Sequence, residues 1–257
     1  MTGAGNNTYL LAGEGRSAAL IDAGIGEARH LADLDAALSA RDARLDTVLV
    51  THGHPDHASG APAIAAAHAD AVFRKHPWPA EDARYPVAWH TLDEGDQIVA
   101  GDEPLVVLLT PGHSPDHVAF WHEPSGTIFT GDLVALGSSV MIHSSRGGDL
   151  AQYLASLERL LALEPRRLLP AHGAAIEEPR AVLVAYLEHR RQRERQVLDA
   201  LRAGHGTVQA IAESIYDGLD PALLPAAREN VRAHLAKLEA ERVALDEDGR
   251  WRLWKSS

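Results

Sequence analysis

Potential metal ligands follow four predicted strands, and this repeated pattern restricts the fold more than any other feature of the sequence. The strands end near residues 50, 110, 130 and 170, and each runs into a loop that carries histidine or aspartate. The first loop contains HGHPDH, residues 52–57, in which three histidines and one aspartate occupy six positions. Ligands at the ends of adjacent strands can converge in space although they lie far apart in the sequence. The pattern therefore predicts that these loops together form one metal site.

Hydrophobic periodicity predicts alternating strands and helices, then a helical region from about Pro179. We expect strands at 7–12, 17–24, 45–52, 96–101, 104–113 and 166–173, a hairpin at 117–123 and 126–132, and helices at 26–40, 60–68 and 149–163. Further helices are expected at 180–202, 207–216 and 221–241, before a hairpin at 243–254 with Asp-Gly at its turn. Helices followed by a hairpin resemble a winged helix. We therefore expect a catalytic domain at 1–178 and a helical, winged-helix C-terminal domain at 179–257.

The composition excludes several kinds of site. The 257 residues contain no cysteine, which excludes disulfides, thiolate zinc sites, iron–sulfur clusters and a cysteine nucleophile. The formal net charge of −12 argues against broad nonspecific binding of nucleic acid. No run is apolar enough to span a bilayer, and MTGAGNNTYL does not resemble a secretory signal. These observations favour a cytoplasmic enzyme that does not contact membranes.

The HGHPDH segment has the geometry of a ligand cluster. His52 and His54 alternate on an extended segment, so their side chains can point the same way. Asp56 and His57 follow a turn at Pro55 and can face a neighbouring point. Neutral imidazole and carboxylate suit zinc, and also iron or manganese.

The same residues carry a family resemblance. THGHPDH resembles the THxHxDH signature of the metallo-β-lactamase fold, and LIDAG, PGH, TGD and PAHG match its other motifs in order. The resemblance implies an α/β protein, an αββα sandwich with a dinuclear site at one edge. It assigns His52, His54 and His113 to one metal, Asp56, His57 and His172 to the other, and Asp132 to both. Two Zn²⁺ ions are implied, with Mn²⁺ or Fe²⁺ as alternatives.

The implied chemistry is hydrolysis by a hydroxide that bridges the two metals and attacks a carbonyl carbon or phosphorus. Asp56 and Asp132 are the expected catalytic carboxylates, since Asp56 can also orient the hydroxide and move a proton. Asp22, in LIDAG, is the candidate for supporting a ligand from behind. It is equally well explained as an aspartate in the turn that ends a strand.

Within this fold, the chain most resembles the branch known as β-lactamase-like protein 2, which has a C-terminal winged helix. The matching stretches are NNTYLL, TPGHSPDH, FTGDLVALGSS, LPAHGAAI, YLEHRRQRERQVL and ARENVRAHLAKLEAE. Members of the branch include an endoribonuclease that acts on single-stranded RNA, and related proteins are thioesterases that release polyketides from carrier proteins. The family has a further strand before NTYL, whereas Met1 lies six residues before Asn7. We therefore expect either an upstream start or a missing edge strand.

Candidate substrate-binding residues lie outside the ligand motifs. His143 follows Asp132 in the sequence and is a candidate for substrate contact, although a loop histidine without function explains it as well. His189 and Arg193 share one face of the 180–202 helix with Tyr186, and we expect Arg190 and Arg191 to point elsewhere. This face either forms a basic rim or packs between the domains. Asn230 and His234 match the branch and bind either substrate or the domain interface.

Three functions remain open. A hydrolase of single-stranded RNA follows from the branch, and Trp78, Tyr85 and Trp89 are candidates for stacking on a base or covering an acyl chain. The acidic charge favours a small acyl substrate, hydrolysed by an esterase or thioesterase of the acyl-carrier or glyoxalase II kind. The third function is a nucleic-acid-binding regulator with a structural metal site. The 221–241 helix has few cations, so we expect it to line the cleft or to contact a second subunit in a homodimer.

Overall fold

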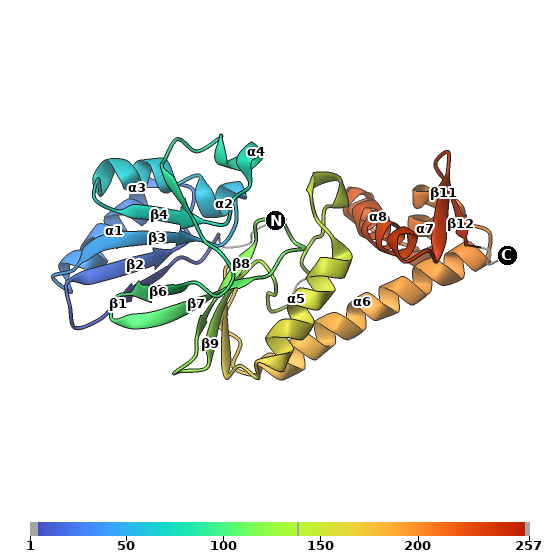
Figure 1. The fold of residues 1–257 in the computed structure, drawn as a ribbon. Helices are drawn as coiled ribbons and strands as arrows, with labels where there is room; N and C mark the ends of the chain where they lie inside the picture. The colour runs from blue at the N-terminus through green and yellow to red at the C-terminus, as the bar shows by residue number, and fades with distance from the viewer. Residues whose placement is uncertain (1–4, 138, 255–257) are drawn as a thin grey trace.

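The computed structural model describes residues 5–137 and 139–254, which form two five-stranded sheets packed face to face and a separate C-terminal unit (Figure 1). The first sheet has the order β1 (Tyr9–Ala12), β2 (Ser17–Ile21), β3 (Arg44–Val50), β4 (Val72–Lys75), β5 (Trp89–Thr91). The second has the order β10 (Arg167–Pro170), β9 (Thr127–Gly131), β8 (Val118–His122), β7 (Glu103–Leu109), β6 (Gln97–Ala100). The expected αββα sandwich is confirmed.

Helices cover the outer face of each sheet. Over the first sheet lie α1 (Ala28–Ser39), α2 (Pro55–Ala58), α3 (Ala61–Ala67) and α4 (Pro79–Asp82), and against the second lie α5 (Leu150–Ala162) and α6 (Pro179–Arg202). Strand alternation explains why both faces are apolar. In β2, Ala18 and Leu20 pack under the helices, whereas Ala19 and Ile21 belong to the core between the sheets. Asp149, the first residue of the helix predicted at 149–163, caps α5 by accepting a hydrogen bond from the main-chain N–H of Gln152.

The sheet topology brings the ligand loops to one edge. Strands β2 to β5 pair in parallel, as do β9 and β10. Strand β7 is antiparallel to β8, which is antiparallel to β9, so β7, β9 and β10 run in the same direction. The loops that follow β3, β7, β9 and β10 therefore meet, as the sequence pattern predicted.

The C-terminal unit consists of α7 (Val208–Ile215), η2 (Pro221–Leu223), α8 (Leu224–Ala240) and the hairpin β11 (Ala244–Glu247) and β12 (Arg250–Leu253). Helix α6 begins where we placed the domain boundary. It contributes residues to the hydrophobic core beside the second sheet and to that of the C-terminal unit. Leu183 and Leu187 pack in the core of the second sheet, whereas Val197 and Leu201 pack in that of the C-terminal unit. None of the helices in the described residues is both long and apolar enough to cross a bilayer.

The sequence pattern missed the elements between residues 72 and 91. We predicted no element between residues 69 and 95, but β4, α4 and β5 lie there. These elements are three or four residues long, too short for a period of 2.0 or 3.6 to be visible. The two alternatives for the region before Asn7, an upstream start or a missing edge strand, concern residues that lie mainly outside the described part.

Candidate metal centre

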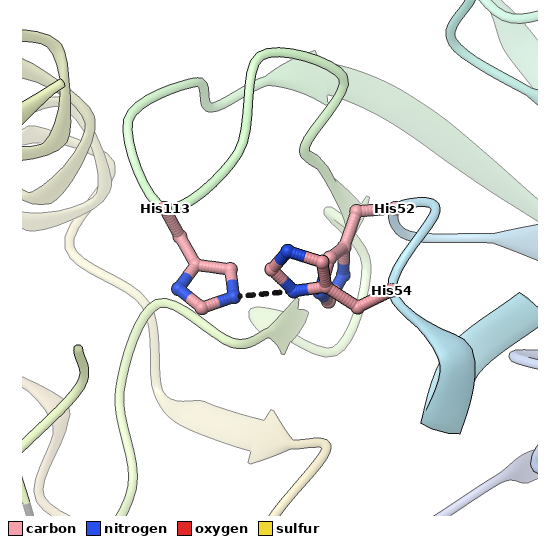
Figure 2. A group of neighbouring side chains, drawn as sticks. All are labelled: His52, His54 and His113. Atoms are coloured by element: carbon pink, nitrogen blue, oxygen red, sulfur yellow. Dashed lines mark hydrogen bonds between the residues drawn. The ribbon is translucent and has the colours of Figure 1, made fainter. Parts of the chain in front are cut away.

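Three histidines converge at the edge of the sandwich, and we call them the three-histidine group: His52, His54 and His113 (Figure 2). Nδ1 of His54 lies 2.9 Å from Nε2 of His52 and 3.0 Å from Nε2 of His113. His52 is fully buried and His113 nearly so. The approach of His52 and His54 follows from the extended backbone after β3, which ends at His54 because Pro55 begins α2.

The main chain sets which ring nitrogen of His113 is available. Its Nδ1 lies 3.0 Å from the carbonyl oxygen of Met141, which can only accept a hydrogen bond. Nδ1 therefore carries the proton, and Nε2 presents a lone pair to the centre of the group. Burial, together with the neighbouring histidines His54 and His57, lowers the pKa of His113 to about 4 against the pull of Asp132. The group is a neutral set of nitrogen donors.

A second group of candidate ligands combines a carboxylate with two imidazoles. We call it the mixed group: Asp56, His57 and His172. Nε2 of His172 lies 3.3 Å from Oδ2 of Asp56, and its Nδ1 donates to the carbonyl oxygen of Gly5 at 2.9 Å. The facing carboxylates of Asp132 and Asp56 raise the pKa of His172 to about 10. In the metal-free protein a proton therefore occupies the position between these carboxylates where a cation would bind.

Asp132 lies between the two groups. Its Oδ1 is 3.5 Å from Nε2 of His57 and 3.3 Å from Nε2 of His172, whereas its Oδ2 is 3.6 Å from Nε2 of His113. One carboxylate oxygen thus faces each group, which is the arrangement that a bridging ligand requires.

Asp132 is held by a histidine whose role the sequence did not reveal. This is His117, whose Nε2 accepts the main-chain N–H of Asp132 at 3.1 Å and whose Nδ1 lies 2.8 Å from Oγ1 of Thr110. Gly131 has a φ of +49°, and a Cβ at this position would lie 2.6 Å from Nε2 of His117. Glycine is therefore needed in TGD for this approach.

Asp22 lies in the turn that ends β2 and also contacts the candidate ligand His57. It ends β2 in a left-handed conformation with a φ of +62°. Its buried carboxylate accepts hydrogen bonds from the main-chain N–H and the hydroxyl of Thr51, and its Oδ2 lies 2.8 Å from Nδ1 of His57. Burial opposes protonation of His57, but Asp22 and Asp132 outweigh it and hold the pKa of His57 well above its ordinary value. Asp22 thereby directs Nε2 of His57 toward the centre.

The residues fit a divalent cation. Nε2 of His57 and Oδ1 of Asp132 are buried and have no hydrogen-bond partner among the described residues. A buried ring nitrogen and a carboxylate oxygen left in this way cost free energy, and a cation that displaced the His57 proton would bind both. In the three-histidine group the ring nitrogens lie 2.9 and 3.0 Å apart, and a cation would replace these contacts. A structural zinc site is closed and four-coordinate, whereas these ligands open onto a cavity.

The cavity above the ligands has a volume of about 370 Å³. Its lining consists of ligands, apolar side chains and a few polar ones: His54, Pro55, Asp56, His113, Asp132, Val134, Ala135, Ser139, Val140, Met141, His143, Arg146 and His172. His143, predicted to contact substrate, lies in this lining. Arg146 was missed, because one arginine in SSRGG has no distinctive sequence signal. Its guanidinium makes no hydrogen bond or ion pair within the part of the chain that the structure describes.

The other predicted substrate residues do not line the cavity. Nε of Arg193 lies 3.4 Å from Nε2 of His189, and its guanidinium stacks on Tyr216 in the C-terminal unit. His234 is buried, with Nδ1 3.9 Å from Oε2 of Glu194. Asn230 is half-buried in α8. Substrate binding by these four residues stays a prediction.

The expectation that Arg190 points elsewhere is wrong. Arg190 is 2% exposed, donates to the carbonyl oxygen of Val140 and lies over the ring of Tyr153. Tyr186, one turn earlier, donates to the carbonyl oxygen of Ala135 at 2.8 Å. Helix α6 thus holds the loop that follows Asp132 at two points. Helical spacing puts positions 186 and 190 on one face, and the packing of α5 and α6 turns this face inward.

The three aromatic candidates have different environments. The Trp78 ring is half-exposed, and its centroid lies 6.3 Å from that of His54. Tyr85 is buried and Trp89 packs edge-on against Phe73 in the core under the first sheet. Of the three, Trp78 alone has a ring contact with a candidate ligand among the described residues, although it is not part of the cavity lining.

Comparison with known proteins agrees with this geometry. Residues 1–172 match the metallo-β-lactamase superfamily, and residues 207–251 match the β-lactamase-associated winged-helix domain. A β-lactamase-like protein 2 homolog of Drosophila melanogaster is 36% identical over 253 residues, covering 94% of this chain and 84% of the relative. An atrochrysone carboxyl ACP thioesterase of Aspergillus fumigatus is 37% identical over 205 residues, and the match covers 77% of this chain but only 60% of that relative.

A solved structure resembles the catalytic part. TTHA1623, crystallised in a di-iron-bound form, is 32% identical, with a TM-score of 0.56 over 72% of this chain and 92% of that one.

Proposed function

This chain belongs to the metallo-β-lactamase superfamily, and we propose that it is a binuclear hydrolase of esters or thioesters with an apolar acyl group. The observation that carries the proposal is the composition of the cavity. Val134, Ala135, Val140 and Met141 line it beside the ligands, and Arg146 is the single lysine or arginine in the described lining. An acyl chain fits the apolar wall, and one cation at the mouth fits one anionic group of the substrate.

The roles of the chain's residues follow from their positions. When bound, two divalent cations would lower the pKa of a water between them and stabilise the negative charge that develops on the carbonyl oxygen. Asp132 would hold the two groups of ligands in register. Asp56, whose side chain is 27% exposed in the cavity, would accept the proton of the attacking water and return it to the leaving group. The nitrogen and carboxylate donors suit two Zn²⁺, with Fe²⁺ or Mn²⁺ as alternatives, and the di-iron form of TTHA1623 supports iron.

Single-stranded RNA is the second candidate substrate, and one observation favours it. Trp78 lies beside the ligand His54, and the Trp78 ring packs against Gly147, the residue after Arg146. A half-exposed aromatic ring and a free guanidinium beside a metal site could bind one base and one phosphate. The net charge of −12 and the single cation in the lining weigh against a longer RNA contact.

A nucleic-acid-binding regulator fits less well. In α8, Arg232 pairs with Glu229, and Lys237 pairs with Glu194 and Glu241. These pairs leave few free cations on the helix that would enter a groove. The open cavity over the ligands is also unlike a structural zinc site.

The test compares two substrates on protein loaded with Zn²⁺, Mn²⁺ or Fe²⁺, with Asp132→Ala as the control. The substrates are a hexanoyl thioester of N-acetylcysteamine and a fluorescent single-stranded RNA. We expect thioester hydrolysis whose kcat falls by at least about 10²–10³-fold in Asp132→Ala, since the ligand shared by both groups is lost. Cleavage of RNA alone would replace the first proposal by the second. Hydrolysis of neither by fully loaded protein would contradict both.

A further inference from the structure

We propose that Lys75 is a positioning residue for the metal centre, because its buried ammonium holds, through Asp116, the peptide that separates two ligand histidines. The same ammonium holds, through Asp82, the segment that carries Trp78. None of these three charged residues belongs to the ligand motifs of the sequence. The proposal depends on metal binding and not on which substrate is cleaved.

Lys75 ends β4 and is 1% exposed. Its Nζ lies 2.7 Å from Oδ2 of Asp116, 2.8 Å from Oδ1 of Asp82 and 2.6 Å from the main-chain oxygen of His76. The ammonium therefore donates hydrogen bonds to Asp116 and to the His76 carbonyl, and it forms an ion pair with Asp82. Two carboxylates and one carbonyl around the ammonium offset the cost of burying its charge.

Asp116 connects Lys75 to the segment that carries two of the ligand histidines. It is fully buried, and its Oδ2 accepts the main-chain N–H of Gly53 at 2.7 Å, while its Oδ1 accepts the hydroxyl of Ser114 at 2.7 Å. The hydroxyl of Tyr85 donates to the carbonyl oxygen of Gly53 at 3.1 Å. Gly53 lies between His52 and His54, so side chains hold both peptides that join it to ligands.

The space around Gly53 is equally restricted. A Cβ at this position would lie 3.1 Å from Cβ of Glu81 and 3.2 Å from Oδ2 of Asp116. The middle residue of HGH is thus enclosed on the side of α4 and on the side of Asp116. A shift of either wall would move the two ligand histidines relative to His113.

The second carboxylate partner holds a segment beside a ligand. Oδ2 of Asp82 accepts the main-chain N–H of Trp78 at 2.8 Å, at the start of α4. The Trp78 ring in turn lies near the His54 ring, with the centroids 6.3 Å apart. One ammonium therefore joins the segment between two ligands to the aromatic side chain next to one of them.

Stability alone does not account for this arrangement. A buried ion pair contributes little net stability compared with well-packed apolar side chains of the same volume. Its particular effect is to fix geometry, and ligands must be held within about 0.5 Å of their binding positions. Partners that orient metal ligands typically change metal affinity by about 10–100-fold when they are removed.

The test is Lys75→Met in the full chain, with Co²⁺ as the probe. The dissociation constant is measured by competition with a chelator, and the visible absorption of bound Co²⁺ reports the ligand geometry. We expect an affinity about 10–100-fold weaker than in the unchanged protein, with an altered spectrum. Phe73→Leu is the matched control: it lies on the same strand, packs in the core under the first sheet, and is expected to lower stability without changing affinity or spectrum.

Wild-type affinity and spectrum in folded Lys75→Met would overturn the proposal, as would an equal loss of affinity in Phe73→Leu. If Lys75→Met does not fold, Tyr85→Phe tests the same clamp, because it removes one hydroxyl and keeps the buried ring. We expect it to weaken Co²⁺ binding about three- to tenfold, the effect of one hydrogen bond, and unchanged binding would overturn the proposal. No substrate is present in these measurements, so they stand apart from the test of the proposed hydrolysis.

Discussion

The pKa values of the histidines are lowered in the three-histidine group and raised in the mixed group. In the first, burial lowers the pKa of His52, His54 and His113, and the nitrogens remain neutral donors. In the second, carboxylates raise the pKa of His57 and His172, so each keeps a proton when no cation is present. A cation binding to the mixed group must therefore displace protons, whereas the three-histidine group is ready to bind at neutral pH.

The supports of the two groups differ accordingly. Main-chain dipoles orient the neutral group: the carbonyl of Met141 receives the His113 proton, and both peptides of Gly53 are clamped. A buried charge orients the mixed group, since Asp22 faces His57. His113 is thus directed by a main-chain carbonyl and His57 by a buried counter-charge, whereas His172 combines both, because the Gly5 carbonyl accepts from its Nδ1 and carboxylates face its Nε2.

The largest difference between the groups should appear in Asp22→Asn. Asparagine tolerates the left-handed backbone at this position but removes the charge facing His57. We expect metal affinity at the mixed group to fall about 10–100-fold, and that of the three-histidine group to change little. Chelator titration with metal analysis should then show one tightly held ion per chain instead of two.

Asp42→Asn is the matched control for this change, because Asp42 is also left-handed, with a φ of +49°, but is exposed and pairs with Arg16 at the surface. We expect no change in metal content. Loss of both ions in Asp22→Asn, or of neither, would remove the distinction between the groups.

A smaller effect, on the other group, is expected for Arg190→Met. The guanidinium donates to the carbonyl oxygen of Val140, beside the Met141 carbonyl that orients His113. Without it we expect affinity at the three-histidine group to fall about three- to tenfold, and the free energy of unfolding to fall by about 1–3 kcal/mol. Co²⁺ binding and urea denaturation measure the two effects.

Arg191→Met provides the comparison for Arg190→Met, since its neighbouring guanidinium is exposed and pairs with Glu158 at 3.1 Å. Surface pairs of this kind contribute about 0–1 kcal/mol. Equal effects of the two substitutions would show that the buried contact with Val140 does not reach the metal centre.

The smallest expected effect is a pH dependence of the metal-free protein. The raised pKa of His172 means that its contribution to stability is complete below its unfolded value of 6.5 and is lost as the pH rises toward about 10. The lowered pKa of His113 has the opposite sign, so its contribution is complete above 6.5 and is lost as the pH falls toward about 4. The melting temperature in EDTA should therefore be highest near pH 6.5.

Loading with metal should remove the alkaline decline, because the cation takes the place of the His172 proton. Thermal denaturation between about pH 4.5 and 9.5, with and without Zn²⁺, measures this. Identical profiles in the two conditions would show that the mixed group does not exchange a proton for a cation.

Local sequence determined much of this protein. Period-2 and period-3.6 patterns identified the longer strands and helices, because an element that buries one face repeats its apolar residues at a fixed interval. Short motifs identified the candidate ligands, because histidines and aspartates gathered in HGHPDH, PGH, TGD and PAHG have little use in packing. Elements as short as β4, α4 and β5 complete no period and were not visible.

Only the tertiary structure decided how the ligands are held. The contacts of Lys75 with Asp116, of His117 with Asp132, and of Arg190 with Val140 join positions 15 to 50 residues apart. One buried lysine or arginine in a sequence looks like any surface residue, because the cost of burying its charge depends on partners brought together by folding. The residues that can bind a metal can therefore be recognised in the sequence. The residues that fix the positions of these ligands can be recognised only in the folded structure, where the sheets and α6 pack together.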